Sequence, residues 1–410
     1  MASPVARDTS PEPSRPSAAP PLLILGFACF AANISVRATD PMLPLIAGQF
    51  DITLHQAAWL ATAYGLPYAA LQLVFGPVAD ALGKAIVIKV CVALLALGFA
   101  LCALAPGFSS LLASRALSGA VAGGIVPVAF ALVGDRVAFA ERQVAISRLV
   151  IAVITGQMGG AALAGGLAQF AGWRSVFAVT AALGSVIAVM AFARLKGTDE
   201  PRRHFALATA IGTYADLVRS RKALIVYGTV FCEGLFMFGL FPFVAPTLAE
   251  RGQGGALTAG LCIASYALGG LIYGLTARHV IRALGPWRMM AGGGILAGLC
   301  YMIGAAPVPW LALAGLFAIS GFGFYLLHNT MQVQSTELSE SARGAAVASF
   351  AACYFIGQGL GPVLAGQFSA AFGFSAMFAA SGVLVAVLGI VSSRLMRASS
   401  SDGGSGMTAR

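Results

Sequence analysis

Apolar residues in this chain gather in long, nearly unbroken blocks rather than in short alternating runs. Each block is roughly 20 residues long, the length that an α-helix needs to cross a hydrocarbon core of about 30 Å. A backbone inside lipid must satisfy its own hydrogen bonds, and helices do so within one segment. The alternating ten-residue segments typical of membrane β-barrels do not occur in the sequence. The pattern predicts an all-α polytopic membrane protein.

Twelve such blocks are present, and most of the connections between them are short, which makes neighbouring helices antiparallel. We place the predicted spans at residues 22–45, 56–75, 85–105, 108–131, 145–168, 174–194, 222–248, 256–277, 287–305, 309–333, 343–370 and 373–394. The one long connection predicts two six-helix bundles, at 22–194 and 222–397, joined by a linker at 195–221.

The segments outside the spans are polar. Residues 1–21 are rich in Pro, Ser and Ala, and residues 398–410 in Ser and Gly, so both are predicted to be disordered tails. The linker is predicted to contain a short amphipathic helix around Ile211–Val218.

The charge distribution gives an orientation. Only 10% of the residues are charged, against about 25% in soluble domains. Of the 25 Lys and Arg residues, 21 fall on the side of the predicted tails and linker, two (Arg174 and Arg251) fall in the opposite loops, and two (Arg37 and Arg115) fall within spans. Basic residues concentrate on the cytoplasmic side of membrane proteins. This predicts an inner or plasma membrane protein with both termini cytoplasmic, and it explains the net charge of +10 without a nucleic-acid partner.

Several classes of chemistry find no support. All seven cysteines lie in apolar blocks, where they are expected to be buried small side chains, and no Cys/His metal-binding spacing occurs. No phosphate-binding Walker loop is present, so ATP is not expected to drive the protein directly. The sequence predicts no cofactor, no metal site and no enzymatic activity.

An internal repeat relates the two predicted bundles. A shift of 201 residues places Arg142 on Arg343, the Gly156–Gln157 pair on Gly357–Gln358, and Gly160 on Gly361. The register holds without a gap over about 36 residues, which indicates two homologous halves. Parallel repeats of this kind form a substrate site between them near the bilayer midplane.

The loop between the second and third spans reads Gly-Pro-Val-Ala-Asp-Ala-Leu-Gly-Lys, from Gly76 to Lys84. It resembles the G-x-L-x-D-x-x-G-R/K signature of the major facilitator superfamily, with Val78 and Ala81 departing from the usual Leu and Arg. The resemblance implies the twelve-helix fold of that family and a cytoplasmic gate at this loop. The predicted gate residues are Gly76, Asp80, Gly83, Lys84, Asp135, Arg142 and Arg343. The alternative is a solvated turn.

Two further segments are similar to motifs of the same family. Leu111 to Gly119 in the fourth span matches L-x-x-x-R-x-x-x-G, whose arginine, here Arg115, the family associates with proton transfer. The glycine run of the fifth span is similar to the family's antiporter motif, although Ala161 replaces its proline. Plain close packing of helices explains the glycines equally well. These packing residues and their repeat copies are Gly156, Gly160, Gly165, Gly166, Gly357, Gly361 and Pro362.

Asp40 and Glu233 are the acidic residues that lie clearly within spans. A carboxyl in a low-dielectric site can exchange a proton near neutral pH. We predict proton coupling through Asp40 and Glu233, with Arg37 and Arg115 tuning their protonation. The alternatives are an ion pair between Arg37 and Asp40, which are three residues apart, a hydrogen-bonded structural Glu233, and an Arg115 that extends to the interface.

The other polar residues within spans are few, which predicts a mostly apolar substrate pocket. The candidate substrate-binding residues are Asn33, Tyr64, Tyr68, Gln157, His328, Asn329, Gln332 and Gln358. A structural role for His328 is an alternative to proton relay or substrate contact.

Together these features predict a monomeric secondary transporter that moves a small molecule across the lipid bilayer. Proton-coupled export of a drug-like compound or metabolite is the first hypothesis. Proton symport or facilitated uptake of a sugar or metabolite is the second, and a non-transporting membrane sensor is the third.

Overall fold

A computed structural model of the chain describes residues 21–195, 212, 215–217, 219–339 and 342–404, and this part is helical and contains no strand. The predicted tail 1–20 and most of the predicted amphipathic helix around Ile211–Val218 lie outside the described residues. The elements are α1 (Leu22–Ile34), η1 (Asp40–Met42), α2 (Leu43–Phe50), α3 (Leu54–Leu82), α4 (Lys84–Ala103), α5 (Phe108–Arg136), α6 (Phe139–Ala171), α7 (Trp173–Arg194), α9 (Arg221–Phe238), η2 (Phe241–Phe243), α10 (Val244–Glu250), α11 (Ala256–Gly304), α12 (Trp310–Thr336) and α13 (Arg343–Gly404).

These elements form twelve membrane spans, as predicted. The first span comprises α1, η1 and α2, and the seventh comprises α9, η2 and α10. Both α11 and α13 contain two spans, because each is interrupted by one glycine with a non-helical backbone. Eight helices of the described chain are long and apolar enough to cross a membrane, and α1 is a shorter apolar helix.

The first and seventh spans break at equivalent depths. In the first, the α-helix ends at Ile34 and a 3-10 turn begins at Asp40, whose successor is Pro41. A residue before proline is disfavoured in the α conformation, and proline itself cannot donate a backbone hydrogen bond. In the seventh span Pro242 occupies the corresponding short 3-10 turn. These breaks place side chains of residues 35–40 inside the protein rather than along a regular helix.

Four turns between antiparallel spans consist of a single glycine. Their backbone angles are similar, with φ between 69° and 99° and ψ between 128° and 169°. Only glycine adopts this region readily, because it has no Cβ. The four turn glycines are Gly83, Gly172, Gly285 and Gly373.

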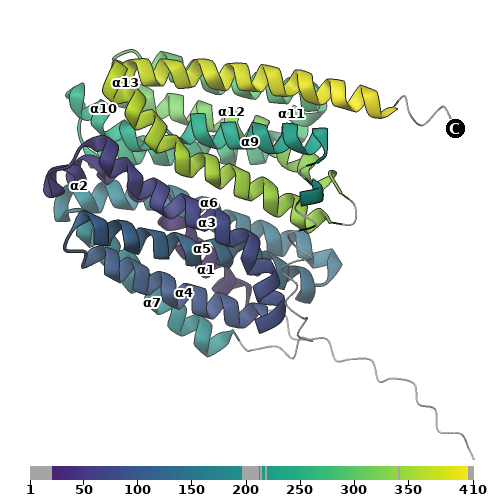
Figure 1. Ribbon diagram of the computed structural model, residues 1–410, viewed down its shortest axis with the longest axis horizontal. Coiled ribbons are helices and arrows are strands. Elements are labelled where there is room, and N and C mark those ends of the chain that lie inside the picture. The colour runs from purple at the N-terminus through teal and green to yellow at the C-terminus, as the bar shows by residue number, and fades with distance from the viewer. Residues whose placement is uncertain (1–20, 196–211, 213–214, 218, 340–341, 405–410) are drawn as a thin grey trace, which may run out of the picture.

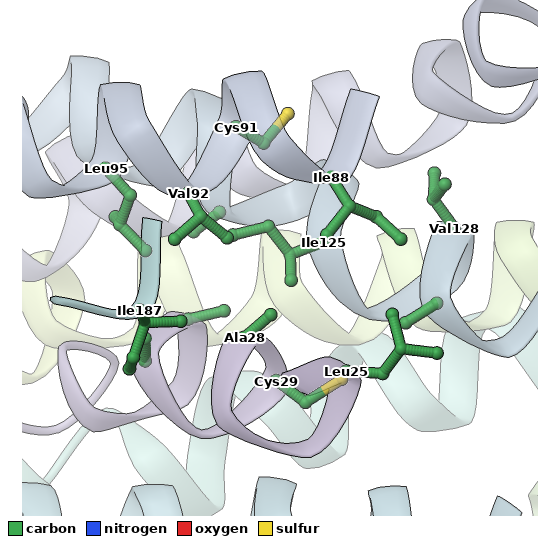
Figure 2. Packing of buried hydrophobic residues seen from close by; sticks show 14 of the residues in the cluster. Leu25, Ala28, Cys29, Ile88, Cys91, Val92, Leu95, Ile125, Val128 and Ile187 are labelled. Atoms are coloured by element: carbon green, nitrogen blue, oxygen red, sulfur yellow. The ribbon is translucent and has the colours of Figure 1, made fainter. Parts of the chain in front are cut away.

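The spans run side by side in two groups, with α1–α7 in the lower part of Figure 1 and α9–α13 in the upper part. The core of the first group is aliphatic: Leu25, Ala28 and Cys29 of α1 pack against side chains of α4, α5 and α7 (Figure 2). The core of the second group is aromatic, with Phe238, Phe241 and Tyr266 at its centre.

We name the two ends of the bundle by the chain. The near end contains the start of α1 and the turn at Gly83, and the far end contains the turns at Gly172 and Gly373. The two groups meet where α3 packs along α13 and where α6 packs along α11. Near the far end the backbones of α6 and α11 touch, because a Cβ on Gly165 would lie 2.4 Å from the Ala256 carbonyl oxygen. At the near end the same two helices line an open cleft. The structure is therefore closed at the far end and open at the near end.

Candidate functional site

Arg37 connects the two groups of helices. It lies in the broken first span, and its side chain is 6% exposed. Its Nη2 donates a hydrogen bond to Gln358 Oε1 of α13 at 2.8 Å, and its Nη1 lies 3.5 Å from Asp40 Oδ2. The guanidinium stacks over the rings of Phe238 and Phe241, 4.4 and 4.9 Å from their centroids. The predicted Arg37–Asp40 pair is therefore present, and Arg37 also holds three groups of the C-terminal helices.

Arg115 is fully buried in α5. It donates hydrogen bonds to Ser35 Oγ at 2.6 Å, to the Ser35 carbonyl at 3.3 Å and to the Leu60 carbonyl at 3.4 Å. The guanidinium also lies 4.3 Å from the centroid of the Tyr64 ring. Arg115 thus faces the break in the first span and does not extend to the membrane interface. A charge in this environment is stabilised by carbonyl and hydroxyl dipoles and by the ring face.

Glu233 and His328 form a buried pair. Glu233, on α9, is 0% exposed, and its Oε2 lies 2.8 Å from His328 Nδ1 on α12. The other carboxyl oxygen, Oε1, has no hydrogen-bond partner among the described residues. The imidazole stacks on Phe324 at 4.7 Å and packs against Tyr354 at 4.9 Å between ring centroids. Aromatic walls therefore surround a pair of groups that can each take up or release a proton.

His328 is one of the predicted substrate-binding residues, and Arg37 and Arg115 are predicted to tune the protonation of Glu233. The structure instead places His328 against Glu233, and the atoms of Arg37 contact Asp40 and Gln358. The two helices are antiparallel, and both residues lie within a few turns of the near end of their helices. That similar depth was visible in the sequence. The rotation that turns the two side chains toward one another was not.

Most other substrate candidates make packed contacts inside the protein. Gln157 donates to Asn33 Oδ1 at 3.1 Å, and the Tyr64 hydroxyl donates to the Ala32 carbonyl at 2.9 Å, both within the N-terminal helices. Two candidates make contacts between the groups: the Tyr68 ring lies 4.2 Å from that of Phe355 on α13, and Gln358 accepts the hydrogen bond from Arg37.

Asn329 and Gln332 line a cavity of about 800 Å³ that opens at the near end. Its walls come from α6, α11 and α12, and they include Ser147, Tyr273 and Tyr325. His328 precedes Asn329 in α12, so the Glu233–His328 pair lies directly behind the wall of this cavity. Ser147, Tyr273 and Tyr325 are not among the residues predicted from the sequence.

The predicted gate residues at the near end fall into two sets. Lys84 bridges two carboxylates: its Nζ lies 3.1 Å from Asp80 Oδ1 and 2.7 Å from Asp135 Oδ2. This joins the start of α4 to the ends of α3 and α5, all within the N-terminal helices. Arg142 donates to the Val137 carbonyl at 3.4 Å, and Arg343 donates to the Thr336 carbonyl at 3.1 Å. Gly83 forms the one-residue turn beside Lys84, whereas a Cβ on Gly76 would meet no atom within 4 Å.

Four of the predicted packing glycines make the same kind of contact in the two groups. A Cβ on Gly156 or Gly160 would lie 2.7 or 2.1 Å from a carbonyl oxygen of α1, so both bring α6 against α1. A Cβ on Gly357 or Gly361 would lie 2.1 or 2.6 Å from a carbonyl oxygen of α9, which is the equivalent contact in the other group.

The remaining glycine contacts differ. Gly165 contacts α11 near the far end, as described above, while a Cβ on Gly166 would meet only the Leu257 side chain at 3.9 Å. Pro362 lies inside α13 beside Gly361. Within the described residues, no group of three or more His, Cys, Asp or Glu side chains is placed to hold a metal ion.

Comparison with known proteins agrees with this architecture. The family model described as Major Facilitator Superfamily matches residues 23–338 and 226–405. The chain is 25% identical to the uncharacterized MFS-type transporter YceJ of Bacillus subtilis over 82% of this chain and 88% of that protein. It is 24% identical to the MFS-type transporter YwfA of the same organism, over 87% of each chain. It is also 30% identical to the MFS efflux transporter aclA of Aspergillus oryzae, over 37% of this chain and 28% of that protein.

Proposed function

The chain belongs to the major facilitator superfamily, and from this we propose that it exports a small molecule in exchange for protons by alternating access. Membership makes it a multi-pass membrane transporter for a small solute. The direction of transport, the coupling to protons and the residues that couple them are our proposals. We further propose that the near end is cytoplasmic, because the loops at that end hold most of the basic residues.

The buried Glu233–His328 pair is the observation that carries the proton-coupling proposal. A carboxylate with no exposed surface is unfavourable in a medium of low dielectric constant unless it is paired or protonated. With one shared proton the pair carries no net charge, either as carboxylate and imidazolium or as carboxylic acid and imidazole. Gain of a second proton makes it cationic, and loss of the shared proton makes it anionic. Each change alters the charge behind the wall of the near-end cavity by one unit.

Asp40 and Arg37 are proposed to link protonation to movement of the two groups. Arg37 donates to Gln358 and stacks on Phe238 and Phe241, all on C-terminal helices, while its ion partner Asp40 lies on the N-terminal side. Protonation of Asp40 removes the negative charge that pairs with Arg37, and this changes the contacts that Arg37 makes with Gln358, Phe238 and Phe241. Separation of the far ends of the two groups requires these same contacts to part. Arg115 is proposed to hold the broken first span in the shape that presents Arg37 and Asp40.

Export is favoured over uptake by the likeness to aclA, whose name describes it as an efflux transporter, and by the glycine run of the fifth span. The free energy of one transported proton is sufficient to drive export against a solute gradient. One proton moving through 100 mV supplies about 2.3 kcal/mol. Each 1.4 kcal/mol corresponds to a tenfold concentration ratio, so this free energy sustains a solute gradient of roughly 50-fold.

Reconstitution of the full chain into proteoliposomes tests the proposal. Vesicles are loaded with a candidate solute, and a proton gradient directed inward is imposed. Antiport predicts that the gradient empties the vesicles, whereas symport predicts that an inward gradient fills them. For Glu233→Gln we expect loss of the gradient-driven component, down to the flux measured without a gradient. The matched control is Glu250→Gln, because Glu250 is exposed at the end of α10 and touches neither group of the pair.

Three results would contradict the proposal. Unchanged gradient-driven flux in Glu233→Gln would remove Glu233 from the coupling. Filling rather than emptying would replace export with symport. Flux that ignores the proton gradient in the wild-type protein would make it a facilitator.

A further inference from the structure

A second cavity lies beside the near-end cavity. It has a volume of about 960 Å³ and is formed by α6 on one side and α11 on the other. Its outer walls are apolar and highly exposed: Leu275 is 85% exposed and Ile151 is 55% exposed. Large apolar side chains with this exposure on a membrane span face lipid rather than water. This cavity is therefore a cleft in the lipid-facing surface.

The lateral cleft and the near-end cavity are continuous. They share six lining residues on two helices: Gln143, Ser147, Val150, Ile154, Gly270 and Gly274. The near-end cavity reaches Asn329 and Thr330, which adjoin His328 in α12. A molecule that passes from the lateral cleft into the near-end cavity thus reaches the face of α12 that carries Asn329, the residue after His328.

The depth of the cleft matches one leaflet of the bilayer. Ile154 lies 15 residues into α6 from its near-end start at Phe139, which corresponds to about 22 Å at 1.5 Å per residue. Half of a bilayer of about 40–45 Å, head groups included, is about 20–22 Å. The cleft therefore extends from the head-group level at Arg142 and Gln143 down to the depth at which acyl chains end.

Polar and apolar groups are segregated along the cleft. Arg142, Gln143 and Ser147 lie at its near end, whereas Val150, Ile151 and Leu271 lie deeper. Arg142 is the charged residue among those that line the cleft. The near-end turns of the same two helices also carry Arg278 and Arg282, against one acidic residue, Glu141. This arrangement suits a molecule with an acidic head and an apolar tail.

We propose that the cleft between α6 and α11 is the substrate entrance, and that it admits an acidic amphiphile already dissolved in the near leaflet. This rests on the proposed export function and names the class of substrate for it. The head would travel past Arg142 and Ser147 while the tail stays against Val150 and Ile151. Such a substrate is removed from the membrane itself and not from the aqueous phase.

Two glycines make the entrance testable. A Cβ on Gly274 would meet no atom within 4 Å, so Gly274→Leu fills open cleft without displacing a neighbour. Gly315, on the exposed face of α12, is equally open, and Gly315→Leu is the matched control because it is not among the lining residues of the cleft. Gly270 is unsuitable, because a Cβ there would lie 2.3 Å from the Tyr325 ring.

The first measurement is binding and does not depend on transport. An Ile154→Cys variant is labelled with a bimane fluorophore and reconstituted into phosphatidylcholine vesicles that contain spin-labelled stearic acid or its methyl ester. We expect the acid to quench the fluorescence more than the ester does. The excess should be lost when Gly274→Leu is added, retained when Gly315→Leu is added, and abolished by Arg142→Gln, which leaves the cleft open. Unmutated protein labelled in parallel corrects for the native cysteines.

The results separate the possibilities. Equal quenching by acid and ester would mean that the cleft holds membrane lipid without preference, which overturns the acidic substrate class. No quenching at residue 154 by either probe would mean that the cleft is closed to lipid, which overturns the entrance. The second measurement is export of an acidic amphiphile from proteoliposomes, where loss in Gly274→Leu with retention in Gly315→Leu supports the entrance. Lipid-accessible binding without any flux in the wild-type protein would contradict the export function and leave the acidic-amphiphile site standing.

Discussion

The two groups of helices use the same backbone contact and different buried chemistry. In the N-terminal group, Gly156 and Gly160 bring α6 against the carbonyl oxygens of α1, and in the C-terminal group Gly357 and Gly361 bring α13 against those of α9. The buried ionisable groups do not repeat. The N-terminal group buries Arg37, Asp40 and Arg115, and Arg115 donates to a hydroxyl and to backbone carbonyls. The C-terminal group buries Glu233, one oxygen of which pairs with an imidazole.

This difference separates what the fold needs from what the transport cycle needs. A contact present in both groups is explained by packing alone, because small residues allow helices to approach closely in lipid. The Glu233–His328 pair lies within the C-terminal group, so a packing contact shared by the two groups does not explain it. We therefore expect the shared glycines to control stability and the unshared pair to control coupling.

The largest effect is expected from a shared glycine. In Gly160→Val, the new Cβ would lie 2.1 Å from the Ile34 carbonyl oxygen, so α1 and α6 must move apart. We expect the free energy of unfolding to fall by about 4 kcal/mol or more. Unfolding in mixed micelles with increasing denaturing detergent measures this. The control is Gly159→Val on the same helix, because its nearest neighbours are 3.9 Å away. Equal stability of the two variants would remove the packing explanation for the glycine run.

A smaller effect is expected from the unshared pair. His328→Phe keeps an aromatic ring against Phe324 but leaves both oxygens of Glu233 without a partner. Breaking a buried pair from one side costs about 3 kcal/mol. His279→Phe, at an exposed position of α11, is the control. The double variant Glu233→Leu with His328→Phe should recover most of the lost stability and still lack gradient-driven flux. Retained coupling in that double variant would place the proton pathway elsewhere.

The smallest effect is expected at Arg115. Arg115→Lys retains the charge, but an ammonium group cannot span the separated acceptors on Ser35 and Leu60 as a guanidinium does. Hydrogen bonds to a charged group contribute about 2 kcal/mol, and we expect a loss of about that size. The same unfolding assay measures it, with Arg194→Lys, at the exposed near-end terminus of α7, as the control. Unchanged stability would show that the hydrogen bonds of Arg115 do not hold the broken first span.

The fold was predictable because it depends on segment length and composition. Twelve apolar blocks, short connections and a repeat of 201 residues require no knowledge of side-chain contacts. The break within the first span was partly predictable from Pro41 and Pro44. The helices are longer than the predicted spans: α6 begins at Phe139 rather than at 145, and α3 continues to Leu82 rather than ending at 75. Near the interface, helices extend through residues that hydropathy assigns to loops.

The sequence was sufficient to predict which residues belong to the candidate site, but not which of them contact each other. An ionisable residue within a span is costly and therefore conspicuous, which is why Arg37, Asp40, Arg115 and Glu233 stand out. Which of them touch depends on how each helix is rotated about its axis, and a uniformly apolar helix carries no periodicity to fix that rotation. The Glu233–His328 contact and the aromatic walls around it therefore emerge only from the packed structure.

The one-residue glycine turns restrict how this protein can be altered. Each of the one-residue turns at Gly83, Gly172, Gly285 and Gly373 leaves no flexible linker between the two helices it joins. We therefore expect a movement of one helix to be transmitted directly to the helix that follows it. Any side chain at these joints would strain the backbone. Reporter insertions or epitope tags are therefore better tolerated at the longer far-end connections 104–107, 251–255 and 305–309.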